Sequence, residues 1–124
     1  KPRVALMATG ALTYQALHAA RALAADGIEC IVLHVPSIKP LDAEAIIAAA
    51  KRTGAVITIE EHQIAGGFGS AVAECLSSTY PVAVTRLGIE DQFGQSGTPE
   101  ELLEHYGLSA AHIAEVARKV VGKV

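Results

Sequence analysis

Short apolar runs alternate with longer stretches of helical periodicity along the whole chain. A continuous apolar run such as residues 4–8 is typical of a strand buried on both faces. The predicted strands cover residues 4–8, 28–35, 55–59 and 82–87. The predicted helices cover residues 13–25, 42–52, 67–76 and 98–106, and a last helix that follows Ser109. This order, βαβαβαβ followed by helices, predicts an α/β fold with a parallel sheet and helices on both of its faces.

The expected helix boundaries carry recognisable end signals. Asp42 and Ser109 are good N-cap residues, and Thr98 stands before a proline that suits a first helical position. Asp26-Gly27 and Gly54 follow two of the helices, where glycine commonly ends a helix. No linker or internal repeat interrupts the pattern, so residues 1–124 form a single domain.

Composition excludes several classes of function. The chain has a formal net charge of −3, no Lys/Arg cluster longer than a pair, 4% aromatic residues and no Trp. These values disfavour nucleic acid and anionic membrane surfaces as partners. Hydrophobic residues make up 51%, yet no apolar run reaches membrane-spanning length.

Two cysteines, Cys30 and Cys75, lie far apart and form no CxxC motif. They are interpreted as small buried hydrophobic residues in a reducing compartment, which predicts a cytoplasmic location. The chain begins at Lys1, without an initiator Met, directly before a strand. It therefore has the look of a trimmed piece, from which a targeting segment could be missing.

Glu60-Glu61-His62 is the first candidate for chemistry, because carboxylates and a histidine at a strand end can act as general acids and bases. Adjacent residues on an extended segment point to opposite sides, however, so the three do not converge on one atom. No nucleophile motif accompanies them. The five histidines also lack metal-ligand spacing. We therefore predict no catalytic residue and no metal site in this chain.

A glycine-rich turn, residues 66–70, precedes a predicted helix. Exposed amides at a helix start can bind an anion. The weak candidate donors are Gly67, Gly69 and Ser70. No lysine follows them as in a P-loop, and Glu60 and Glu61 would repel a phosphate. Close packing of the glycines against a neighbouring domain or subunit is the favoured interpretation.

A long polar loop, residues 88–97, follows the fourth predicted strand. Long loops in compact domains are usually functional. Phe93, if exposed there, is a natural anchor for a partner domain, with Asp91 beside it.

Several motifs occur together and in order: Ile-Lys-Pro-Leu-Asp at 38–42, Thr-Ile-Glu-Glu-His at 58–62 with Gly-Gly-Phe-Gly-Ser at 66–70, and a C-terminal part at 91–108. They resemble the C-terminal domain of transketolase-type, thiamine-diphosphate-dependent enzymes over essentially the whole chain. The first motifs are shared with deoxyxylulose-phosphate synthases and 2-oxo acid dehydrogenase β subunits. The last is more similar to transketolases, especially those encoded as two sections. Gln92 departs from the Arg that relatives often carry, which puts a phosphate or ion-pair role there in doubt.

The resemblance implies a three-layer α/β/α sandwich with parallel strands in the order 2-1-3-4, and a further antiparallel strand before residue 1. It implies a structural and dimerisation domain of an enzyme that moves a two-carbon ketol unit between sugar phosphates. Thiamine diphosphate and a divalent metal would lie between the pyrimidine-binding and diphosphate-binding domains, on the same chain or a separate subunit. The motif that holds them has no match here: the nearest stretch is Ala25-Asp26-Gly27, and the chain contains no Asn.

In this interpretation the parent enzyme is a homodimer, and this chain supplies neither cofactor site nor chemistry. The candidate interdomain or dimer contacts are Glu60, Glu61, His62, Gly66, Gly67, Phe68, Asp91 and Phe93. Within the superfamily, the C-terminal domain of a deoxyxylulose-phosphate synthase or of a 2-oxo acid dehydrogenase β subunit stays open as an alternative. Two alternatives of another class also stay open: a free-standing flavodoxin-like module that binds a phosphate-bearing ligand, and a homodimerisation module without a ligand. The donor and acceptor sugars also stay open.

Overall fold

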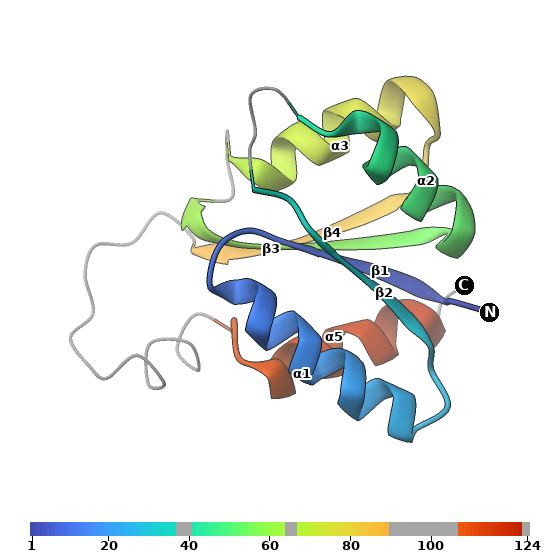
Figure 1. Cartoon of the computed structure of the whole chain (residues 1–124), viewed down its shortest axis with the longest axis vertical. Coiled ribbons are helices and arrows are strands. Elements are labelled where there is room, and N and C mark those ends of the chain that lie inside the picture. The colour runs from blue at the N-terminus through green and yellow to red at the C-terminus, as the bar shows by residue number, and fades with distance from the viewer. Residues whose placement is uncertain (37–40, 64–66, 90–106, 123–124) are drawn as a thin grey trace.

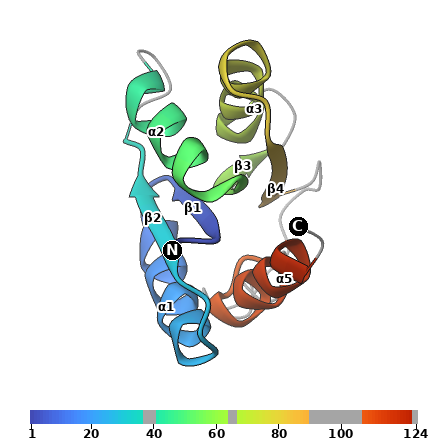
Figure 2. The ribbon, with the colours of Figure 1, turned by 90° about the vertical axis from the view of Figure 1, so that its right-hand side faces the viewer.

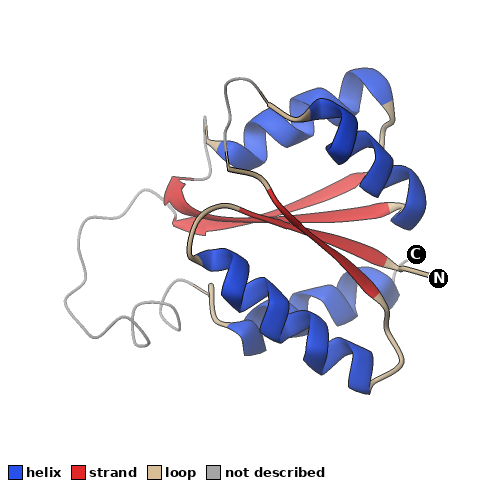
Figure 3. Ribbon diagram, viewed as in Figure 1, coloured by secondary structure: helices blue, strands red, loops and turns tan. Residues whose placement is uncertain are grey.

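A computed structural model describes residues 1–36, 41–63, 67–89 and 107–122 of the chain. Four strands form one sheet between two layers of helices (Figures 1 and 3). The strands are β1 (Val4–Ala8), β2 (Cys30–His34), β3 (Ala55–Gln63) and β4 (Ala83–Ile89). The helices are α1 (Leu12–Ala25), α2 (Ala43–Thr53), α3 (Phe68–Thr79) and α5 (Ala110–Gly122).

The sheet has the order β2-β1-β3-β4, and every pairing in it is parallel. Helices α1 and α5 cover one face, and α2 and α3 cover the other (Figure 2). The α/β class and the strand order 2-1-3-4 are therefore confirmed. In such a sheet the carboxyl ends of all strands meet at one edge, which is where open α/β domains usually place their functional residues.

Strand β1 shows why the sheet is buried on both sides. All five of its residues are fully buried. Leu6 packs into the core under α1 and α5, whereas Ala5 and Met7 pack into the core under α2 and α3. The alternation follows from the period of two along a strand, and two apolar cores explain why this stretch has no polar face.

The helix ends follow the predicted signals. The Asp42 carboxylate accepts the N–H of Ala45 at 3.2 Å and caps α2, and Gly54 ends that helix in the left-handed conformation at φ 82°. The Ser109 hydroxyl accepts the N–H of His112 at the start of α5. The caps at Asp42 and Ser109 are therefore confirmed.

Three strand boundaries differ from the prediction. Strand β2 is shorter than 28–35, and β4 continues through Gly88 and Ile89, which were expected in a loop. Strand β3 continues past Ile59 to Gln63, with a shift in its register against β4 between these two residues. The polar residues after Ile59 predict the end of a strand, but β4 pairs with β3 again at Gln63↔Ile89 beyond the register shift and so extends its ladder. The helix predicted at 98–106 lies outside the described residues.

The two ends of the described chain meet at the edge of the sheet where the strands begin. Arg3, just before β1, donates a hydrogen bond to the carbonyl of Val121 in the last turn of α5, at 3.5 Å. Arg118 of α5 also pairs with Asp26 after α1, at 2.7 Å. These contacts fasten the last helix to the first elements of the fold.

Candidate functional site

The predicted corner lies where β3 leads into α3, at the carboxyl edge of the sheet. Glu60, Glu61 and His62 belong to β3, and Gly67 is the N-cap of α3 with an extended backbone (φ −96°, ψ −156°). The side chains of Glu61 and His62 lie outside the described part. Residues 64–66 and 90–106, which include the predicted Gly66, Asp91 and Phe93, lie outside it as well.

The Glu60 carboxylate closes this corner from inside. Its Oε1 accepts the N–H of Phe68 at 2.9 Å, and its Oε2 accepts the N–H of Gly69 at 2.6 Å. Glu60 is 1% exposed. The Gly67 N-cap has no side chain for these amides, so a carboxylate from β3 takes the place of a local cap. A negative charge at the N-terminus of a helix is also favoured by the helix dipole.

This contact bears on the weak anion site considered at Gly67, Gly69 and Ser70. The Gly69 amide already donates to Glu60, so an external anion would have to displace a buried carboxylate. The charge that a phosphate would bring is thus supplied by the chain itself. Glu60 and Phe68 are each 1% exposed, so both side chains point into the domain. Both residues shape the corner from within.

Gly69 is required at this corner by a close approach of α3 to the sheet. A Cβ atom at this position would lie 2.7 Å from the Thr58 hydroxyl, 2.8 Å from Glu60 Oε2 and 3.0 Å from Arg86 Cγ. Any larger residue would push the first turn of α3 away from β3. Close packing was the favoured interpretation of the glycines in this turn, and Gly69 packs closely against β3 and β4. This contact lies within the domain.

Two further side chains complete the corner. The Thr58 hydroxyl is buried and finds no hydrogen-bond partner among the described residues. Arg86 of β4, opposite Thr58 in the ladder, donates from Nη1 to the Ser70 hydroxyl at 3.1 Å. Both β3 and β4 thus hold the first turn of α3. General acid–base chemistry needs a group within reach of a substrate, and the buried, hydrogen-bonded Glu60 does not offer one.

Titratable groups elsewhere form no comparable cluster in the described ranges. His34, at the end of β2, lies with its Nδ1 2.8 Å from the Thr13 hydroxyl of α1. Burial raises the pKa of the Cys30 thiol, and the adjacent Glu29 carboxylate raises it further. No group of His, Cys, Asp and Glu in the described residues is arranged to hold a metal ion. None of the described helices is both long and apolar enough to span a bilayer.

Sequence reasoning did not find the cap at Glu60 or the contacts of Thr58 and Arg86. A partial signal existed: a helix that begins at Gly67-Phe68-Gly69 has no local side chain for its first amides. Such a helix needs an acceptor from another element. The sequence did not say which element would supply it.

Fold and site together define a parallel α/β domain whose carboxyl edge carries a glycine-rich helix start closed by an internal carboxylate. The family model for the transketolase C-terminal domain matches residues 1–113, and the chain belongs to this family. The resemblance drawn from the motifs is therefore confirmed.

Among curated relatives, the chain is similar to the 6-deoxy-6-sulfo-D-fructose transketolase subunit SqwH of Clostridium sp. (strain MSTE9). The two are 44% identical over 117 residues, which is 94% of this chain and 36% of the relative. It is also 45% identical to the 1-deoxy-D-xylulose-5-phosphate synthase of Heliobacterium modesticaldum, over 94% of this chain and 18% of that enzyme. The chain thus spans between about a fifth and about two fifths of the length of these relatives.

Solved structures give the same result. A split-gene transketolase, described as an inactive β4 tetramer, superimposes with a TM-score of 0.91 at 46% identity. The match covers 97% of this chain and 39% of that one. A transketolase from Pichia stipitis matches with a TM-score of 0.70 at 21% identity, which supports the fold alone.

Proposed function

We propose that this chain is the C-terminal domain of a transketolase-type transferase that moves a two-carbon ketol unit between sugar phosphates. The parent enzyme uses thiamine diphosphate and a divalent metal, which its other domains hold, and it works as a homodimer in the cytoplasm. The domain supplies structure: it supports the pyrimidine-binding domain and contributes to assembly. The match to the split-gene transketolase, at 46% identity over 97% of the chain, carries the proposal.

The geometry of the corner supports placing the cofactor outside this domain. A diphosphate at the start of α3 would meet the amides that Glu60 already occupies, and would lie against its negative charge. Two negative charges in contact repel each other strongly in a buried site. The residues of this corner therefore do not fit a diphosphate–metal group, and we assign no step of the reaction to them.

The corner has a structural role in this proposal. Glu60 and Gly69 fix where α3 begins and therefore where the segment between β3 and α3 leaves the sheet. Glu61, His62, Gly66 and Gly67 belong to or adjoin that segment. We propose that they face the neighbouring domain or subunit, as do Asp91 and Phe93 in the segment after β4.

Calorimetry tests the absence of a cofactor site. Thiamine diphosphate with Mg²⁺, titrated into the 124-residue chain, should give no binding heat. Micromolar affinity would contradict the structural role. A two-carbon transfer assay on the complete parent enzyme, with a panel of sugar phosphates, tests the activity itself.

One alternative within the family has a specific observation in its favour. The 45% identity to a 1-deoxy-D-xylulose-5-phosphate synthase is as high as that to the transketolase subunit. Formation of 1-deoxyxylulose 5-phosphate by the complete enzyme, without ketol transfer, would favour this alternative over transketolase. A 2-oxo acid dehydrogenase β subunit is the other alternative, and neither product would then form.

A free-standing phosphate-binding module is the alternative of another class. It requires an external anion at the start of α3. If it holds, Glu60→Gln should strengthen the binding of inorganic phosphate, because it removes the competing charge. If neither the wild-type chain nor the Glu60→Gln variant binds phosphate measurably, the result counts against a phosphate-binding module.

A further inference from the structure

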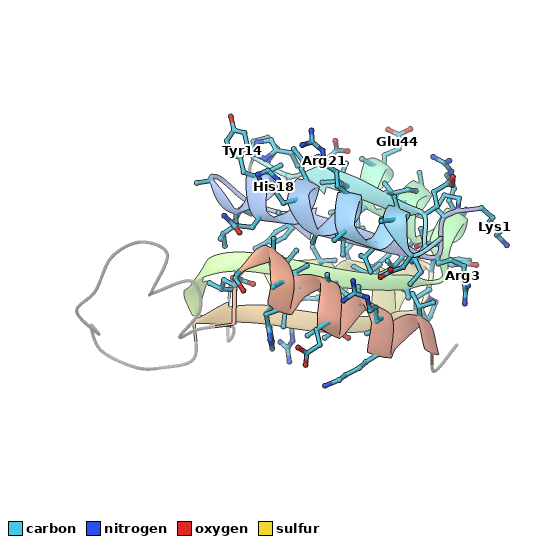
Figure 4. All side chains as sticks on the ribbon, turned by 90° about the horizontal axis from the view of Figure 1, so that it is seen from below. Lys1, Arg3, Tyr14, His18, Arg21 and Glu44 are labelled. Carbon is cyan, nitrogen blue, oxygen red and sulfur yellow. The ribbon has the colours of Figure 1, made fainter. Side chains whose placement is uncertain are left out.

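We draw no further inference here: the strongest candidate, the outer face of helix α1 from which Tyr14, His18 and Arg21 project (Figure 4), carries nothing, because its two exposed large apolar side chains, Tyr14 and Leu17, form no continuous apolar patch and nothing in the structure shows what covers them.

Discussion

Gly69→Ala is the sharpest test of the corner between β3 and α3. The new Cβ would lie 2.7 Å from the Thr58 hydroxyl and 2.8 Å from Glu60 Oε2, both too close for real carbon atoms in proteins. The Glu60 carboxylate is the more movable of the two, but moving it weakens its bonds to the Phe68 and Gly69 amides. Thr58 is β-branched and sits in a central strand, so its rotation is restricted.

The magnitude follows from these options. Overpacking a core site costs about 1–3 kcal/mol, and weakening a hydrogen bond to a buried charge costs about 1.5–3 kcal/mol. Alanine in a helix recovers up to about 1 kcal/mol relative to glycine. We expect a net loss of about 2–3 kcal/mol in the free energy of unfolding. For a chain of this size, that corresponds to a fall in Tm of roughly 6–15 °C.

Urea unfolding followed by circular dichroism measures this loss. Gly122→Ala is the matched control, because Gly122 is also helical but has open space where its Cβ would lie. It should leave stability unchanged or slightly raised. A Gly69→Ala chain within about 0.5 kcal/mol of wild type would refute the close-contact argument.

A second substitution separates the two close contacts. Thr58→Ala removes the hydroxyl that the new methyl meets, so the double variant Gly69→Ala/Thr58→Ala should be less destabilised than the sum of the single variants. We expect a coupling of about 1 kcal/mol. Strict additivity would mean that the strain of Gly69→Ala is relieved at Glu60 instead.

Three further predictions concern the buried Glu60 and Thr58 and the half-buried Cys30. Glu60→Gln should cost about 1.5–3 kcal/mol in urea unfolding, because one acceptor becomes a donor that faces an amide, whereas exposed Glu44→Gln should cost less than about 0.5 kcal/mol. Thr58→Val should change stability by less than about 1 kcal/mol in either direction, because its hydroxyl has no described partner to lose. The raised pKa of Cys30 keeps its thiol protonated above the usual range, so its alkylation should be slower than that of a free thiol at the same pH, and Glu29→Gln should speed it. The same shift lowers stability as pH rises from the ordinary thiol pKa to the raised one, since the unfolded chain ionises first.

Much of the fold follows from local pattern. Strand β1 was predicted at its observed bounds, Val4–Ala8. Five consecutive apolar residues in an α/β chain are typical of a strand buried on both faces. The caps at Asp42 and Ser109 depend on residues within one turn, and such local contacts can be predicted. The strand order came from the resemblance, since periodicity does not say which strands are neighbours.

The features that the sequence did not predict depend on contacts between residues far apart in the chain. Strand β3 was expected to end at Ile59, because Glu60 and the residues after it are polar. Glu60 is buried because its carboxylate accepts the N–H groups of Phe68 and Gly69, eight and nine residues further along. These N–H groups reach Glu60 only when the start of α3 packs against the sheet. A carboxylate is normally exposed, so the residue type predicts a surface position for Glu60, whereas the structure buries it. The close approach at Gly69 likewise involves side chains of β3 and β4, so the residues next to Gly69 in the sequence do not predict it.

The hydrogen bond between Arg3 and Val121 has a consequence for how this domain is used in longer proteins. The two ends of the described fold lie together at one edge of the sheet, whereas the corner at Glu60 lies at the opposite edge. A covalent connection at either end therefore lies away from the corner. Domains with adjacent ends also tolerate fusion, insertion and circular permutation. This arrangement suits a module that makes up 36% of one relative and 18% of another, because the same unit can be joined to polypeptides of different length without redesign.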